Sequence, residues 1–160
     1  MRSIVTIGVY GFDGETFLQR LQHAGVRLLL DLRQRRGVRG AEYAWANARR
    51  LQAALVQAGI AYEHHLELAP TTALRRLQYA EDARQGVGKR SRRELAAEYT
   101  RRYTTEILDR ADLARIVSGL PSHGTVALLC VERDPEACHR SLVAQRLSEQ
   151  YQVTIEHLRP

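Results

Sequence analysis

The stretch SIVTIGVYGFDGETFLQRLQHAGVRLLLD, residues 3–31, decides the fold class of this 160-residue chain. An apolar strand pattern at its start breaks at a glycine-containing turn, and a helix capped by Asp13 follows. Gly25 is placed to end that helix, and Val26 begins a second apolar strand pattern. A strand, a helix and a strand in this order and length predict a right-handed parallel crossover. The sequence therefore predicts an α/β fold.

Three more strand patterns extend this unit, at residues 60–64, 125–130 and 152–157. The uniformly apolar stretch 125–130 is typical of a central parallel strand. Helices are expected over about 44–58, 70–84, 91–107, 109–118, and from Asp134 and Pro135 onward. We expect residues 1–160 to form one Rossmann-like domain, a mostly parallel sheet of about five strands with helices on both faces.

Composition narrows the class of protein. At 18.2 kDa and 44% hydrophobic residues, the chain is large enough for one sizeable core. It contains no charge-free apolar run near the roughly 20 residues of a membrane span, and residues 1–4 lead into a strand instead of a signal peptide. Two cysteines are too few for a disulfide framework, so reduced thiols and a cytoplasmic location without membrane association are expected. The sequence does not indicate an oligomeric state.

The net charge of +6 comes almost wholly from arginine, because Lys89 is the sole lysine. A guanidinium binds phosphate through two parallel hydrogen bonds and also stacks on bases, which favours a phosphate-bearing partner. A bias of the genome toward arginine codons would explain the same total, so clustering is more informative. Two regions, 33–50 and 84–102, combine arginine with aromatic residues. This pattern favours a nucleic-acid partner, with DNA preferred weakly over RNA.

Candidate site residues follow the expected strands, since ligands of open parallel sheets bind beyond the carboxyl ends of the strands. Asp31 and Glu132 each come just after an apolar strand, and His139 is expected near Glu132 at the start of the last helix. A histidine beside a carboxylate is able to move protons near neutral pH, so these three residues are the predicted catalytic groups. A buried histidine that only holds the strand end is the alternative. The predicted substrate or phosphate contacts are Tyr10, Arg33, Arg36, Arg39, Tyr43, Trp45 and Arg140.

The two cysteines are expected to be structural. In phosphatases of the Cys-x5-Arg type an arginine lies six residues beyond the cysteine, but here that residue is Glu136, which would repel an anion. A zinc site from Cys130, Cys138 and His139 is disfavoured, because adjacent helical residues diverge by about 100° and no fourth ligand is evident. The sequence thus predicts neither a metal nor a cofactor.

Several motifs together carry a family resemblance. They are Thr6-Ile-Gly-x-Tyr10-Gly, Leu-Asp31-Leu-Arg33, Gly59-Ile-x-Tyr62, and Cys130-x-Glu132-x-Asp-Pro-x-x-Cys138-His139-Arg140-Ser. The chain resembles the bacterial and archaeal family catalogued as domain of unknown function 488. The resemblance spans nearly the whole chain and implies an α/β fold, but no settled activity. Many sequences of that family carry Leu-Gly-Gly after the third strand, where this chain reads Leu66-Glu67-Leu, so its ligand is expected to differ.

These observations lead to one main functional hypothesis and two rivals. The main hypothesis is a hydrolase acting on nucleic acid or a nucleotide, most specifically on the N-glycosidic bond of a modified base, as a DNA glycosylase does. A carboxylate, Asp31 or Glu132, would stabilise the sugar cation while a flipped base stacks on an aromatic ring. The first rival is a non-catalytic nucleic-acid-binding module. The second is a small-molecule enzyme with a pocket for an anionic metabolite.

Overall fold

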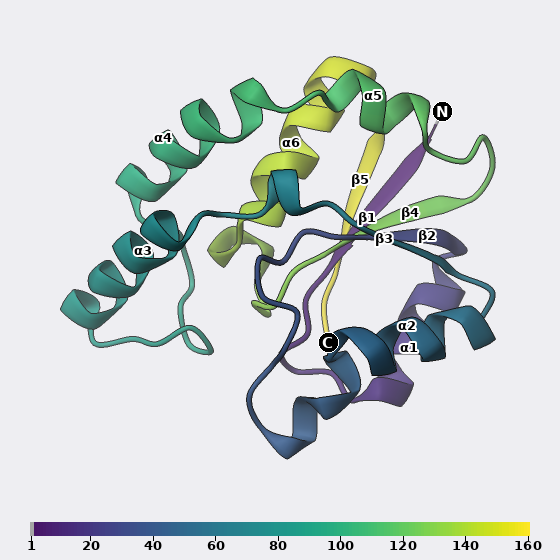
Figure 1. Cartoon of the computed structure of the whole chain (residues 1–160), viewed down its shortest axis with the longest axis horizontal. Coiled ribbons are helices and arrows are strands. Elements are labelled where there is room, and N and C mark those ends of the chain that lie inside the picture. Colours follow the sequence, from purple (N-terminus) through teal and green to yellow (C-terminus); the bar gives the residue numbers. More distant parts are fainter. Residues whose placement is uncertain (1) are drawn as a thin grey trace.

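The computed structural model describes residues 2–160 and contains one five-stranded sheet. The strands are β1 (Ser3–Ile7), β2 (Val26–Asp31), β3 (Ala61–His64), β4 (Thr125–Leu129) and β5 (Thr154–Leu158). Their order is β3-β2-β4-β1-β5, and every neighbouring pair is parallel (Figure 1). The predicted α/β class and the parallel sheet with helices on both faces are confirmed.

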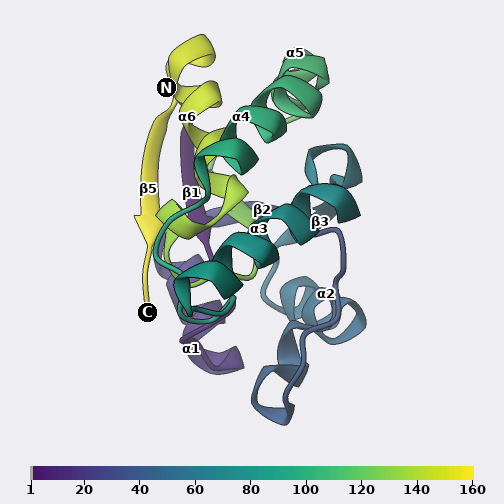
Figure 2. The ribbon, with the colours of Figure 1, turned by 90° about the vertical axis from the view of Figure 1, so that its left-hand side faces the viewer.

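Helices cover the two faces of the sheet unequally (Figures 1 and 2). On one face lie α1 (Gly14–His23) and α2 (Ala48–Gln57), and on the other lie α3 (Thr72–Gln85), α4 (Ala97–Glu106), α5 (Leu113–Ser118) and α6 (His139–Tyr151). Right-handed crossovers that run in opposite directions along a sheet place their helices on opposite faces. The chain first moves toward β3 through α1 and α2, and then returns toward β5 through α3 to α6.

The strand β4 lies at the centre of the sheet, as its uniformly apolar sequence predicts. All five of its residues are buried, as expected for a strand covered on both faces. One apolar cluster, which includes Phe17, Leu21, Leu51 and Leu55, fills the space beneath α1 and α2. A second cluster lies beneath α3 to α6 and includes Leu74, Tyr99, Tyr103, Leu113 and Leu147.

Local signals at the first helix act as predicted. Asp13 caps α1 by accepting a hydrogen bond from the Thr16 amide at 2.8 Å, and Gly25 adopts a φ of +71° after the helix. No helix within residues 2–160 has the length and apolarity to cross a membrane.

The start of the last helix differs from the prediction. Pro135–Ala137 form only a short 3-10 turn, and α6 begins at His139 with Cys138 as its N-cap. Cys138 is extended, with φ −142° and ψ 143°, so the chain turns sharply between the 3-10 turn and the helix. Asp134 and Pro135 therefore start the 3-10 turn, not α6. This difference changes where the side chains of Cys138 and His139 point.

Two other predicted helices begin later than expected. Residues 41–46 form a 3-10 helix before α2 begins at Ala48, and α4 begins at Ala97 instead of Ser91. In the second case tertiary hydrogen bonds hold the chain outside a helix: Gln78 on α3 accepts from the Ala96 amide at 2.8 Å. Residues 86–96 are thus an irregular segment packed against α3.

The sheet order creates a topological switch point between β2 and β4. The connection after β2 passes over one face toward β3, while the connection after β4 passes over the other face toward β5. Crevices at such points, beyond the carboxyl ends of the strands, are where open α/β sheets bind ligands.

Candidate active site

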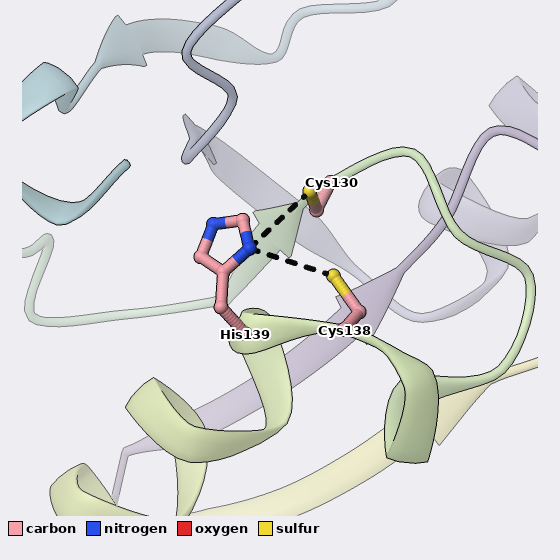
Figure 3. Close-up of side chains that lie close together, drawn as sticks. All are labelled: Cys130, Cys138 and His139. Carbon is pink, nitrogen blue, oxygen red and sulfur yellow. Dashed lines mark hydrogen bonds between the residues drawn. The ribbon is translucent and has the colours of Figure 1, made fainter. Parts of the chain in front are cut away.

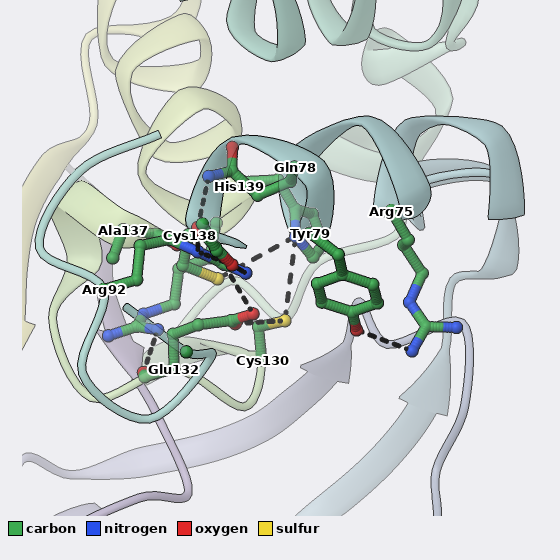
Figure 4. A network of polar contacts seen from close by, with 12 residues as sticks. Arg75, Gln78, Tyr79, Arg92, Cys130, Glu132, Ala137, Cys138 and His139 are labelled. Carbon is green, nitrogen blue, oxygen red and sulfur yellow. Dashed lines mark hydrogen bonds and ion pairs between the residues drawn. The ribbon is translucent and has the colours of Figure 1, made fainter. Parts of the chain in front are cut away.

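A pocket of about 660 Å³ opens at this switch point. Its floor comes from the residues after β4 and from the start of α6, and its roof from α3 and from residues 88–92 (Figure 4). The segment after β2 forms a side wall. Pockets of this volume hold ligands the size of a nucleotide.

Two thiols, an imidazole and a carboxylate line the pocket floor. Cys130 lies directly after β4 and Cys138 and His139 lie at the start of α6, and their side chains converge (Figure 3). The His139 Nδ1 atom is 3.7 Å from Cys130 Sγ and 3.8 Å from Cys138 Sγ. Glu132 Oε2 lies 3.4 Å from Cys130 Sγ. The expectation that Cys138 and His139 diverge as neighbours in a helix is wrong, because Cys138 precedes the helix in extended conformation.

A backbone contact fixes the orientation of the His139 ring. His139 Nε2 lies 2.9 Å from the Leu32 carbonyl oxygen, which only accepts, so Nε2 carries a proton and donates it. In the neutral ring Nδ1 then presents its lone pair toward the two sulfurs. Tyr103 packs against the ring with centroids 5.4 Å apart.

The charges of the floor groups depend on one another. Burial opposes ionisation of Cys138, but the hydrogen bond from Cys130 and the cations of Arg140 and His139 hold the pKa of the Cys138 thiol well below its ordinary value. Burial and the neighbouring Cys138 sulfur raise the pKa of the Cys130 thiol. Burial lowers the pKa of His139, yet the Cys138 sulfur and Glu132 reverse this and raise it overall.

Glu132 is the buried carboxylate of the floor. Burial, followed by repulsion from Cys138, raises its pKa, and Lys89 and Arg92 act in the opposite direction. Arg92 Nη1 lies 3.3 Å from Glu132 Oε1, and the same guanidinium forms a tighter ion pair with Asp82 at 2.7 Å. Arg92 thus connects the irregular segment, α3 and the pocket floor.

Gly8 allows the segments that follow β1 and β4 to approach closely beneath the pocket floor. A Cβ atom at Gly8 would lie 2.0 Å from the Glu132 carbonyl oxygen, so no larger residue fits without a backbone shift. The amides of Val9 and Tyr10 both donate to the Val131 carbonyl at 3.0 Å. These contacts place the backbone of Glu132 against the end of β1.

Cationic and aromatic side chains form the walls and mouth of the pocket, namely Tyr10, Arg35, Arg39, Arg75, Tyr79, Lys89 and Arg90. Arg90 lies over the rings of Tyr10 and Tyr43, 5.1 and 5.2 Å from their centroids, and pairs with Glu42 at 3.3 Å. The Lys89 ammonium differs from it, since no ion pair within residues 2–160 involves it. Although burial opposes its charge, Glu132 helps to raise the pKa of Lys89.

The structure brings together five of the residues predicted from the sequence to form the site. They are Tyr10, Arg33, Arg39, Glu132 and His139, which all line the pocket. The prediction that Asp31 faces the same pocket is wrong, because its side chain is fully buried. Asp31 instead accepts hydrogen bonds from Arg33 Nε and Nη2 at 2.9 and 2.8 Å and from the Tyr62 hydroxyl at 2.6 Å.

Two predicted phosphate contacts have their donors committed to the protein. Arg33 is 1% exposed, pairs with Asp31 and donates to the Ala46 carbonyl at 2.8 Å. Arg140 is fully buried, and its Nη1 and Nη2 donate to the carbonyls of Glu132 and Arg133 at 2.6 and 3.1 Å. Each side-chain nitrogen of both arginines donates to a protein acceptor, so the structure assigns the two residues to the strand ends and does not support the phosphate-binding prediction for them.

Three more predicted contacts lie outside the pocket lining. Arg36 donates to the Tyr62 hydroxyl at 3.3 Å. Trp45 packs on Phe17, with ring centroids 4.8 Å apart. The Tyr43 hydroxyl accepts a hydrogen bond from the Gly11 amide at 3.2 Å, and the Tyr43 ring packs against the Arg90 guanidinium. None of the three is placed to touch a ligand in the pocket.

Four lining residues are not predicted individually from the sequence, namely Lys89, Arg92, Arg75 and Tyr79. The first two lie in the predicted basic region 84–102. One signal was available for Lys89, because it is the sole lysine and lies between glycine and arginine in a loop. No local pattern predicts the ion pair of Arg92 with Asp82, since the two residues are ten positions apart, one on a helix and one in a loop.

Comparison with known proteins gives one match. A family model described as "Domain of unknown function DUF488" matches residues 13–147. No curated protein and no solved structure matches the chain significantly.

Proposed function

The chain belongs to the family described as domain of unknown function DUF488. From its pocket we propose that it is a hydrolase acting on a nucleotide unit, free or exposed in a nucleic acid. One observation carries the proposal. A single pocket at the switch point combines a carboxylate, an imidazole and thiols on its floor with unpaired positive charge and tyrosines on its walls. Chemistry and recognition groups thus share one nucleotide-sized space.

The walls support recognition of a phosphate-bearing ligand with an aromatic base. Lys89 offers a charge without an ion-pair partner among residues 2–160, and Arg35 and Arg39 extend from the segment after β2. Tyr10 and Tyr79 also line the pocket, with Arg90 over the ring of Tyr10 and Arg75 over that of Tyr79, and a base stacked on an aromatic side chain gains about 1–3 kcal/mol. The enclosed volume favours one nucleotide over a stretch of duplex.

The floor supports hydrolysis with Glu132 as the principal acid–base group. Among the described residues that line the pocket, Glu132 is the sole carboxylate. It is therefore the group to take a proton from an attacking water or to stabilise a sugar cation. The bond we propose is the N-glycosidic bond, because its cleavage develops positive charge close to where a carboxylate would lie. His139, tied to Leu32, holds the floor in place beside it.

The direct test measures base release from nucleosides, nucleotides and single-stranded oligonucleotides that contain modified bases. Glu132→Gln should lower kcat by about 10²- to 10⁴-fold with little change in KM, because the amide binds similarly but moves no proton. Glu136→Gln is the matched control, since Glu136 is exposed and pairs with Arg159 away from the pocket floor. It should leave kcat unchanged.

Three results would overturn the proposal. Equal turnover in Glu132→Gln and the unmodified chain would remove the catalytic assignment. Binding to single strands that weakens steeply with salt, but without any product, would indicate a non-catalytic binding module. Failure to bind nucleotides or oligonucleotides even at low salt would leave a pocket for another anionic metabolite.

A further inference from the structure

We propose that Cys130 Sγ, Cys138 Sγ and His139 Nδ1 bind one zinc ion, with the fourth coordination position open to the pocket. The three residues are buried, and their ligand atoms all lie within 4.8 Å of one another. Two thiolates and an imidazole form a donor set that suits zinc. This site goes beyond the function proposed above, which names no metal.

The distances agree with tetrahedral coordination. Zinc bonds of about 2.3 Å to sulfur and 2.0–2.1 Å to nitrogen separate tetrahedral sulfur and nitrogen ligands by about 3.6 Å. Here His139 Nδ1 lies 3.7 and 3.8 Å from the two sulfurs. The two sulfurs lie within 4.8 Å of each other, and Figure 3 shows His139 Nδ1 facing both of them.

The surroundings of His139 are those of a metal ligand. A ligating histidine commonly donates its other ring N–H to a carbonyl or carboxylate, which fixes the ring and its tautomer. His139 donates Nε2–H to the Leu32 carbonyl at 2.9 Å and so directs the Nδ1 lone pair toward the sulfurs. The end of β2 thereby orients a ligand of a site built by β4 and α6.

The extended backbone of Cys138 makes the site possible. As the N-cap of α6, Cys138 projects its side chain toward Cys130 while His139 starts the helix. Cys130 directly follows the central strand β4, and Cys138 and His139 are the N-cap and first residue of α6, so regular structure holds the ligands on both sides. Such a preformed set binds a metal without a large cost in ordering.

The open position explains how the floor would supply a nucleophile, a step that rests on the proposed function. Zinc lowers the pKa of a bound water to about 7, and all three ligands and Glu132 line the same pocket. Glu132, 3.4 Å from Cys130 Sγ, lies beside the ion and would accept the proton of that water. Glu132 would then act next to the metal without holding it.

Metal binding is tested on the full chain, without reference to substrate. Zinc content is measured by atomic spectroscopy after purification, and the chain stripped with a chelator is titrated with Co²⁺ while its absorption is recorded. We expect one metal per chain, together with thiolate-to-cobalt charge-transfer bands and the intense visible bands of tetrahedral Co²⁺. An octahedral cobalt spectrum without thiolate bands, or no uptake of either metal, would overturn the proposal.

Variants assign the ligands. Cys130→Ser, Cys138→Ser and His139→Asn should each lower zinc affinity by more than the roughly 10–100-fold that loss of an outer-shell partner costs. His123→Asn, which changes an exposed histidine, is the control and should bind zinc normally. Glu132→Gln should also retain the metal while losing turnover. If the site variants fail to fold, the cobalt spectrum of the unmodified chain decides the question.

The outcomes separate this inference from the proposed function. Zinc bound by these three residues, in a chain that hydrolyses no nucleotide bond, would keep the site and remove the function. Full hydrolytic activity in a chain that takes up no metal would keep the function and remove the site. Recovery of Cys130 and Cys138 as a disulfide under reducing purification would also overturn the metal site.

Discussion

The ends of β2 and β4 are neighbours in the sheet, and each carries buried ionisable groups, yet the two ends differ in what surrounds them. At the end of β2, the Arg33 guanidinium donates two hydrogen bonds to the Asp31 carboxylate, and the Tyr62 hydroxyl donates another. Beyond β4, Cys130 and Glu132 face a pocket and a lysine that makes no ion pair within residues 2–160.

The contrast shows that burial of a charged residue at a strand end does not by itself indicate catalysis. The end of β2 is closed, because each carboxylate oxygen of Asp31 accepts two hydrogen bonds and the side chain is fully buried outside the pocket lining. The end of β4 is open, because Glu132 has two long contacts, to Arg92 at 3.3 Å and to Cys130 at 3.4 Å, and borders a pocket of about 660 Å³. A completed hydrogen-bond set stabilises the fold, while an incomplete set beside a pocket is free to bind and react.

The largest expected effect is on the closed end. Asp31→Asn should lower the free energy of unfolding by about 3–5 kcal/mol, because it leaves the Arg33 guanidinium buried without a counter-charge. Urea unfolding measures the loss. Asp109→Asn, which breaks the partly exposed pair with Arg146, should cost less than about 1 kcal/mol. If both variants lower the free energy of unfolding by less than about 1 kcal/mol, the buried pair at the end of β2 is no more important for stability than a partly exposed one.

The open end should respond in binding instead of stability. Lys89→Met should weaken affinity for a nucleoside monophosphate by about tenfold or more, since a hydrogen bond to a charged group contributes about 1.5–3 kcal/mol. Its unfolding free energy should change by less than about 0.5 kcal/mol, as for a surface change. Calorimetric titration provides the affinity, and Lys89→Arg should restore most of it. A large loss of stability with unchanged affinity would make Lys89 a structural residue.

A smaller effect tests how complete the closed end is. Tyr62→Phe removes the 2.6 Å hydrogen bond to Asp31 and should cost about 1–2 kcal/mol in urea unfolding. Tyr79→Phe provides the comparison, because its hydroxyl only accepts from Arg75 at the surface. If Tyr62→Phe and Tyr79→Phe lower the free energy of unfolding equally, the hydrogen bond from Tyr62 to Asp31 adds no stability at the end of β2.

The smallest effect concerns His65, just beyond β3 at the same edge of the sheet. Burial opposes protonation of His65, but hydrogen bonds to Glu63 and Glu67 raise its pKa above the ordinary 6.5. The folded state therefore binds the proton more tightly than the unfolded chain does. This contribution is complete below pH 6.5 and is lost as the pH rises through the folded-state pKa, at a cost below about 1 kcal/mol. Unfolding curves across that pH range, compared with His65→Gln, measure it; an identical pH slope in the two proteins would contradict the assignment.

Local patterns predicted much of the fold but only part of the site. The strand patterns at residues 3–9, 26–31 and 125–130 lie on β1, β2 and β4, because buried parallel strands are apolar throughout. Glu132 and His139 were found because they follow a strand and begin a helix. Asp31 is the polar residue at the end of another apolar strand and lies outside the pocket, so a polar residue at a strand end does not by itself identify a site residue.

By itself the sequence determined the α/β class, the parallel crossovers and the family, since each depends on local apolar periodicity, glycine turns and short motifs. Only the tertiary structure decided that the cysteines lie beside His139, that Arg33 and Arg140 stabilise the strand ends, and that Lys89 and Glu132 line one pocket. The physical reason is that the hydrogen-bond and ion-pair partners of a buried polar group come from residues far away in the sequence. His139, for example, is oriented by the carbonyl of Leu32, 107 residues away.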